Sequence, residues 1–166
     1  MTDPLTPAPP HLLAFLRRYD VDAEFIAPGV PMPTVPAAAA AIGVPEAQIL
    51  KTLLFASDSR YVVAIANGSG RINRALLAEA SGLDRPRAAS PDIVSEITGY
   101  PAGGVSPLGL PEELPVIVDV GVPRVPVAYG GGGRADLLLR VATADVIRLN
   151  NAIVRRIVED SSGHPA

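Results

Sequence analysis

The sequence predicts an α+β fold in a single domain. Helical segments are expected early and in the middle of the chain, with strands between and after them, and this order fits an α+β sheet better than a doubly wound one. A length of 166 residues is enough for one domain with a substantial core. A hydrophobic content of 48% with only 19% charged residues excludes a disordered chain. We divide the chain into a disordered arm at residues 1–9, a domain at 10–158 and a frayed end at 159–166.

Five helices are predicted from apolar stripes and from residues that favour helix ends. Apolar side chains form a stripe over residues 10–19, with two arginines at its C-terminal end. The other helices begin at a capping side chain, and most of them end at glycine. Their expected ranges are 37–42 with Thr34 as the cap, 74–80 with Asn73, 91–98 with Ser90, and 143–149 with Thr143.

Strands are predicted where short apolar runs are separated by turn residues. The expected ranges are 23–27, 49–55, 61–65, 87–89, 116–120, 125–129 and 137–141. Residues 99–109 and 130–133 are too rich in glycine and proline for regular structure, so we expect loops there. Residues 151–158 fit either a strand or a helix.

The strand at 49–55 carries the most informative side chain. Lys51 is the only lysine in the sequence, and strand alternation places it on the same face as Ile49, Leu53 and Phe55. An ammonium group among hydrophobic side chains is costly unless it meets an anion or a cleft. Lys51 is therefore either a strand-end lysine that reaches water or a functional lysine, and we favour the functional interpretation.

Composition argues against several classes of site. The absence of cysteine excludes disulfides, a thiolate nucleophile and cysteine metal sites, and His11 and His164 lie too near the ends for a histidine triad or zinc site. We expect no metal and no cofactor. A net charge of −3 argues against indiscriminate binding of nucleic acid, DNA included. With no apolar run of about 20 residues and no signal-peptide pattern, we expect a cytoplasmic protein without a membrane partner.

Residues 34–150 resemble, in order, the YbaK and prolyl-tRNA synthetase editing-domain family of aminoacyl-tRNA deacylases. The matching segments are the alanine-rich helix at 37–43, the lysine strand at 49–53, the loop and helix at 71–82, Gly103 three residues before Ser106-Pro107, Val118-Asp119, and residues 131–134. The resemblance implies a mixed β-sheet that is curled, open barrel-like and flanked by helices. It also implies a pocket for the 3′ end of an aminoacylated tRNA.

The resemblance further implies an activity and a set of site residues. Relatives hydrolyse the ester between a wrong amino acid and the terminal ribose, and they need no protein nucleophile or metal. On this chain the implied catalytic residues are Lys51 and Gly103, with Lys51 at the terminal phosphate or the ester. The implied substrate-binding residues are Thr52, Gly104, Val105, Ser106, Pro107, Gly131 and Asp136. Thr52 directly after the lysine resembles the cysteinyl-specific branch, whereas alanyl-specific relatives often carry asparagine there.

We therefore expect a trans-editing deacylase for a Cys-tRNA(Pro)-like or Ala-tRNA(Pro)-like substrate, with prolyl-tRNA synthetase as a partner. Two alternatives stay open. Gly130 stands where some relatives carry serine, and Asp136 is one place out of register with their acidic residue. These differences would fit a non-catalytic tRNA or synthetase adaptor that keeps the pocket. A hydrolase of small esters or thioesters would share the pocket chemistry without contacts to tRNA.

Overall fold

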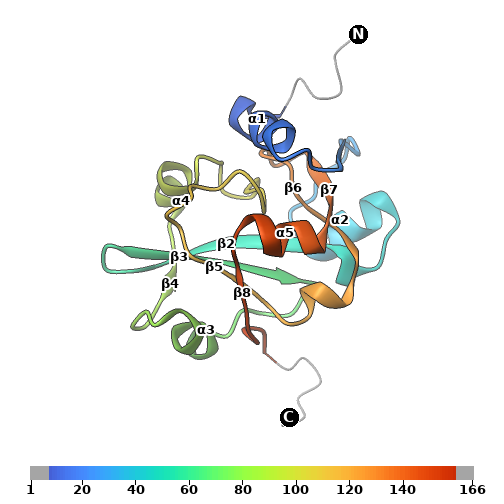
Figure 1. Ribbon diagram of the computed structural model, residues 1–166. Helices are drawn as coiled ribbons and strands as arrows, with labels where there is room; N and C mark the ends of the chain where they lie inside the picture. The colour runs from blue at the N-terminus through green and yellow to red at the C-terminus, as the bar shows by residue number, and fades with distance from the viewer. Residues whose placement is uncertain (1–7, 160–166) are drawn as a thin grey trace.

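Two β-sheets adjoin in the computed structural model, which describes residues 8–159 (Figure 1). One sheet has three strands in the order β1-β7-β6, and the other has five in the order β4-β2-β3-β5-β8. The family resemblance implied one curled, open barrel-like sheet, and this detail is not confirmed. The strands form two sheets because β4 pairs with β2 only at Phe55 and Ala56. Next to the start of β2, the pairing with β6 is a single isolated bridge between Ile49 and Tyr129. The expected α+β class with flanking helices is confirmed.

The elements follow the predicted order closely. The helices are α1 (Pro10–Arg18), α2 (Val35–Ile42), α3 (Arg74–Ser81), α4 (Pro91–Thr98) and α5 (Thr143–Leu149), with short 3-10 helices η1 (Glu46–Gln48) and η2 (Val122–Arg124). The strands are β1 (Ala23–Ile26), β2 (Leu50–Ser57), β3 (Arg60–Asn67), β4 (Arg87–Ala88), β5 (Val116–Val118), β6 (Val127–Gly131), β7 (Leu138–Ala142) and β8 (Ile153–Val154). None of the helices in the described part of the chain is long and apolar enough to cross a membrane.

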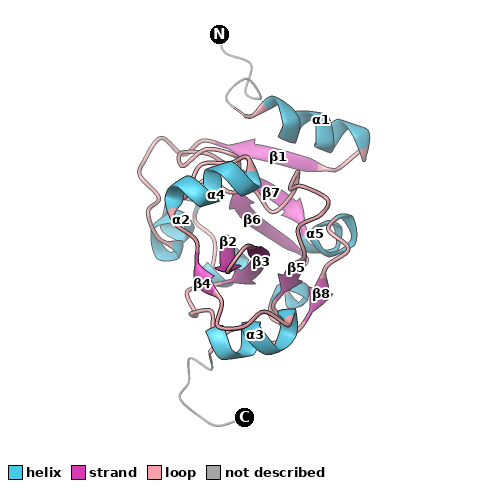
Figure 2. Cartoon of the chain, turned by 90° about the vertical axis from the view of Figure 1, so that its left-hand side faces the viewer, coloured by secondary structure: helices cyan, strands magenta, loops and turns pink. Residues whose placement is uncertain are grey.

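The β2–β3 hairpin runs through the middle of the molecule. Figure 2 shows α1 and the three-stranded sheet on one side of it and α3 on the other. The two strands are antiparallel, whereas β3–β5 and β5–β8 are parallel, so the five-stranded sheet is mixed as predicted. Alternate β2 side chains enter different cores. Leu50 and Leu54 join the large core between the sheets, and Phe55 joins a second core with Leu77 of α3.

Three predicted helix caps are confirmed by side-chain hydrogen bonds. Thr34, Asn73 and Ser90 accept from the amides of the residues three positions on, at 3.2, 3.0 and 3.4 Å. The predicted cap at Thr143 is wrong. Its hydroxyl donates to the carbonyl of Val125 at 2.6 Å, and α5 begins without a side-chain cap. Here a contact 18 residues away in sequence takes the hydroxyl that local chemistry assigned to the helix.

Three further expectations need correction or completion. Gly130 and Gly131 belong to β6 rather than to a loop, because both pair with β7. The ambiguous segment 151–158 contains β8 and a bridge from Val158 to Ile72. Residues 1–7 and 160–166 of the expected flexible ends lie outside the described residues, whereas Ala8 is buried and the amide of Glu159 donates to Arg71 at 2.9 Å.

Candidate active site

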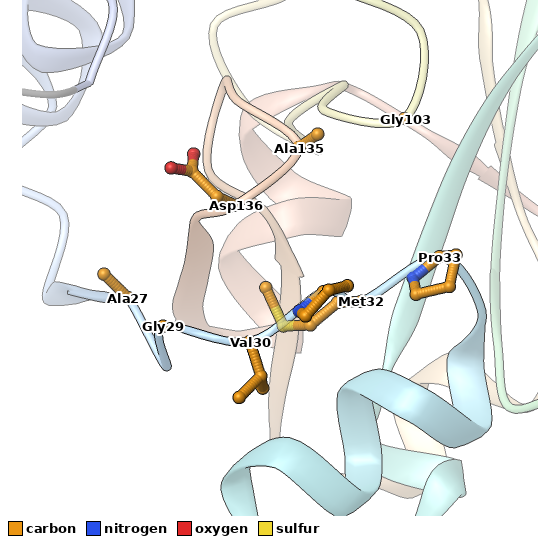
Figure 3. A pocket seen from close by; sticks show the side chains of 9 residues that line it. Ala27, Gly29, Val30, Met32, Pro33, Gly103, Ala135 and Asp136 are labelled. Atoms are coloured by element: carbon orange, nitrogen blue, oxygen red, sulfur yellow. The ribbon is translucent and has the colours of Figure 1, made fainter.

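Two cavities share one wall near the start of β2. The smaller has a volume of about 280 Å³ and includes Lys51 and Thr52 in its lining, and the larger has about 600 Å³. Both cavities are lined by Met32, Pro33, Gly103 and Ala135. In Figure 3 the segment from Ala27 to Pro33 runs along one side of the larger cavity, and Gly103, Ala135 and Asp136 stand on the other. A ligand can therefore extend from one cavity into the other.

Lys51 is partly buried where it lines the smaller cavity. Its ammonium donates a hydrogen bond to the carbonyl oxygen of Gly70, in the loop after β3. Burial lowers the pKa of Lys51, and the negative charge of Asp119 opposes this by raising it. The expected row of three buried hydrophobic neighbours is only partly present, because Leu53 is 40% exposed. An ammonium has three donors, so two remain for a ligand.

Thr52 places an unpaired hydroxyl in the wall of the smaller cavity. The residue is only 8% exposed, and its Oγ1 has no hydrogen-bond partner among residues 8–159. A buried polar group without a partner costs about 1–3 kcal/mol, so such groups are uncommon in folded proteins. A polar atom of a bound ligand would satisfy this hydroxyl.

Gly103 stands at the junction of the two cavities. Its backbone has φ +85°, a conformation that side chains disfavour, and a Cβ there would meet nothing within 4 Å. Its neighbour Gly104 has the opposite surroundings, because a Cβ would lie 2.7–2.9 Å from the backbone of Arg134. The amide of Gly133 also donates to the carbonyl of Gly104 at 2.9 Å. The two glycine-rich loops therefore pack backbone to backbone, and this packing leaves Gly103 facing open space.

Val105 and Gly131 join these loops inside the smaller cavity. Both residues line it, and a Cβ on Gly131 would collide with the carbonyl of Val105. Only glycine lets the end of β6 approach the loop this closely. The residues predicted as catalytic, Lys51 and Gly103, thus come together at one cavity with three of the predicted substrate-binding residues. These three are Thr52, Val105 and Gly131, and the whole set comes from three separate parts of the chain.

Three other residues named from the sequence lie outside the linings of both cavities: Gly104, Ser106 and Pro107. Ser106 is fully buried, and its Oγ accepts a hydrogen bond from the amide of Leu108 at 3.1 Å. Burial raises the pKa of the nearby Tyr100, whose hydroxyl donates to the carbonyl of Leu108 at 2.7 Å. The Ser106-Pro107 pair therefore shapes the loop that carries Gly103.

Asp136 lines the larger cavity and lies outside the lining of the one with the lysine. Its carboxylate forms a two-point ion pair with Arg134, with contacts of 3.0 and 2.7 Å. Both side chains are about half exposed or more, at 47% for Arg134 and 64% for Asp136, so the pair adds little to stability. Within residues 8–159, no three His, Asp or Glu side chains gather where a metal ion could bind.

Several wall residues were missed or only suggested by the sequence. Met32 lines both cavities, whereas Val105, which was named as a site residue from the sequence, lines the smaller one. Pro33 and Ala135 line both cavities and carried no recognisable signal, because apolar loop residues have no chemistry of their own. The proline-rich composition of residues 28–33 was the one available hint of a special loop.

The chain shares its fold with solved structures. A protein described as hypothetical protein APE2540 is 30% identical, with a TM-score of 0.81, over 90% of this chain and 99% of that one. A candidate trans-editing enzyme for prolyl-tRNA synthetase is 24% identical, with a TM-score of 0.78, over 96% of this chain and 100% of that one. Because its identity is only 24%, the second structure shows a shared fold and nothing further.

Proteins that are similar in sequence include proline–tRNA ligases. The proline–tRNA ligase of Streptococcus pneumoniae is 30% identical over 131 residues, which are 75% of this chain and 21% of the ligase. That of Nitratidesulfovibrio vulgaris is 33% identical over 114 residues, which are 67% of this chain and 20% of the ligase. The chain thus spans about a fifth of the length of these relatives. Residues 30–149 match the model of the aminoacyl-tRNA editing domain. This match covers well over half of the sequence, and the chain belongs to the aminoacyl-tRNA editing domain family.

Proposed function

We propose that this chain is a trans-acting deacylase that hydrolyses the ester of mischarged aminoacyl-tRNA. The observation that carries the proposal is the smaller cavity, where Lys51, the unpaired Thr52 hydroxyl and Gly103 meet. The similarity to part of the proline–tRNA ligases supports a Cys-tRNA(Pro)-like or Ala-tRNA(Pro)-like substrate. The same similarity suggests prolyl-tRNA synthetase as the partner.

In the proposed reaction, water adds to the ester carbonyl carbon and the bond to the ribose oxygen breaks. One proton of the water ends on that ribose oxygen, the other is released to solvent, and the amino acid leaves as its carboxylate. The free donors of Lys51 stabilise the negative charge that develops on the carbonyl oxygen. An aminoacyl ester is already activated, so charge stabilisation and positioning supply much of the acceleration.

The two cavities fit the two parts of this substrate. Pockets for drug-sized ligands measure about 300–1,000 Å³, so the smaller cavity suits a small aminoacyl group and the larger one a nucleoside. The larger cavity offers the apolar side chains of Val30, Pro31 and Met32 to the flat face of a base. The carboxylate of Asp136, the single charged group in its lining, is paired with Arg134, and its oxygens keep lone pairs that accept hydrogen bonds from hydroxyl or amino groups. The ester would then lie at Gly103, where the cavities join.

The test is deacylation of tRNA(Pro) charged with cysteine, alanine or serine by the wild type and by Lys51→Ala. We expect release of one of these amino acids by the wild type and its loss in the variant. Circular dichroism and thermal unfolding establish that both proteins are folded. Release at the wild-type rate by Lys51→Ala would remove the lysine from the mechanism.

The alternative function is a tRNA or synthetase adaptor that binds without turnover. It gains some support from the engagement of the Lys51 ammonium by Gly70. Binding of a stable amide analogue of aminoacylated tRNA, with no release of amino acid from any ester, would select the adaptor.

A further inference from the structure

The chain continues beyond the matched editing domain, and its last described residues return to the surroundings of Lys51. Residues 30–149 make the family match, whereas β8 and residues 155–159 follow it. In Figure 1 the chain after β8 descends toward α3, on the side of the five-stranded sheet that carries the second core. Ile157 is fully buried in that core, so this segment is an integral part of the domain.

We propose that residues 157–159 position Lys51 for deacylation, acting through Asp119 and Gly70. The inference rests on the function proposed above. Gly70 and Asp119 lie inside the matched range but outside both cavity linings, and residues 157–159 follow that range.

The first link joins Lys51 to Val158 through Gly70. The Lys51 ammonium donates to the Gly70 carbonyl, and a Cβ on Gly70 would lie 2.6 Å from Cγ1 of Val158. The backbone that holds the ammonium therefore rests directly on this valine. A shift of Val158 would move the hydrogen-bond acceptor of the lysine.

The second link joins Asp119 to the same segment. Asp119 is only 6% exposed, and its Oδ1 accepts from the amides of Ile157 and Val158 at 2.8 and 3.1 Å. Its Oδ2 accepts from the amide of Gly121 at 2.8 Å. Three backbone donors therefore hold the carboxylate in place.

The segment is also fastened to the three residues that follow Gly70. The amide of Asn73 donates to Ile157 at 2.7 Å, and the amide of Glu159 donates to Arg71 at 2.9 Å. A bridge pairs Ile72 with Val158. These contacts, together with those of Asp119, join the loop that carries the acceptor and the carboxylate as one unit.

The charge of Asp119 acts on Lys51 from this fixed position. It raises the pKa of the lysine against the larger lowering effect of burial, and so favours the ammonium form. The titratable groups on adjoining segments, Arg71 and Tyr129, do not contribute to this shift. The arrangement both places the ammonium and helps to keep it protonated.

The first test is the pH dependence of kcat for Asp119→Asn. Without the carboxylate the pKa of Lys51 falls further, so activity that needs the ammonium is lost at a lower pH than in the wild type. Asp145→Asn is the matched control, because Asp145 is paired with Arg148 on α5 at 2.9 Å and lies outside both cavity linings. We expect no change of the profile in the control. A fall in kcat with an unmoved alkaline limb in Asp119→Asn would reduce Asp119 to a structural role and overturn the proposal.

The second test keeps the proposal decidable if Asp119→Asn does not fold. Gly70→Ala suits the backbone, because Gly70 has no positive φ, but its Cβ must displace Val158. We expect kcat to fall about tenfold or more with little change in KM, since small misplacements of catalytic groups cost up to about a hundredfold. The double variant Gly70→Ala/Val158→Ala removes the collision and should recover kcat. Wild-type kcat in Gly70→Ala, or no recovery in the double variant, would overturn the proposal.

These results separate the inference from the function on which it rests. If the wild type releases no amino acid from any aminoacyl-tRNA, the proposed function fails. If the wild type is active and the variants give the contrary results, only the positioning role of residues 157–159 fails.

Discussion

The two cavities differ in the kind of structure that builds them. The smaller one draws on β2, α2, the end of β6 and the start of β7, and both Lys51 and Thr52 sit on a strand. The larger one is lined mostly by the loop from Ala27 to Pro33, with Gly103 from a second loop and Ala135 and Asp136 from a third. Rigid strands hold catalytic groups to narrow tolerances, whereas loops tolerate change and adapt to ligands. Under the proposed function, the catalytic groups therefore lie in the smaller cavity, and the larger cavity binds the nucleoside.

The largest expected effect comes from Lys51→Met, which removes the charge and keeps an unbranched side chain. We expect a loss of about a hundredfold to a thousandfold in kcat, the usual cost of a missing oxyanion donor. The same change should raise thermal stability at neutral pH. The pKa of Lys51 is lowered in the folded state, so its burial penalty is present when the group is charged and is relieved only as pH rises toward 10.5. Unfolding curves at pH 7 and at pH 10 measure this, and a stability gain that does not shrink at the higher pH would contradict it.

The next prediction compares two glycines that line the smaller cavity. Gly131→Ala should destabilise the protein by about 1–3 kcal/mol, because its Cβ collides with the carbonyl of Val105. Gly103→Ala meets open space and carries only the strain of its positive φ, so it should cost about 1 kcal/mol. Its methyl group stands at the junction of the cavities, and KM for aminoacyl-tRNA should rise. Urea unfolding and steady-state kinetics separate the two, and equal stability losses would mean that the loops adjust freely.

A smaller effect distinguishes two buried threonines of the same size. Thr52→Val removes an unpaired hydroxyl and should stabilise the ligand-free protein by about 1 kcal/mol while weakening substrate binding. Thr98→Val is the control, because its hydroxyl donates to Val94 at 2.6 Å and accepts from Tyr100 at 3.1 Å. It should destabilise by a similar amount and leave KM unchanged. Thermal unfolding of both variants, with and without a stable amide analogue, tests whether the two substitutions change stability in opposite directions.

The smallest effect belongs to the larger cavity. Val30 is 49% exposed in its lining, and Val154 is a comparably exposed valine, at 36%, on β8. Val30→Asn should weaken an aminoacyl-adenosine amide analogue about threefold to tenfold, as expected for part of one apolar side chain. Val154→Asn should leave that affinity unchanged. Equal calorimetric affinities for the two variants would mean that the base does not rest on this loop.

The sequence predicted those features that depend on neighbouring residues. The caps at Thr34, Asn73 and Ser90 act within three residues, and all three are present. Lys51 stood out because strand alternation and a single lysine are visible in the sequence. The family resemblance then gave Thr52 and Gly103 a place beside it.

Features that depend on distant residues were missed. Gly130 is part of a strand because Leu139 pairs with it. The anchoring of Asp119 by residues 38 and 39 positions later is equally invisible before folding. Ser106 lies outside both cavity linings because Leu108 and the buried Tyr100 draw its hydroxyl into the loop, and a sequence motif does not show which way a side chain points.

The anchoring of Lys51 also sets an order of events during synthesis. Its ammonium rests on Gly70, and the Gly70 loop is fastened by residues 157–159, more than a hundred positions after the lysine. A nascent chain emerges with its N-terminal part first, and contacts at long sequence separation form slowly. The lysine would therefore leave the ribosome well before its support exists. A nascent chain that stops before residue 157 holds the whole matched range, residues 30–149, without the support of its lysine. Under the proposed function, capture of aminoacylated tRNA then waits until residues 157–159 have left the ribosome.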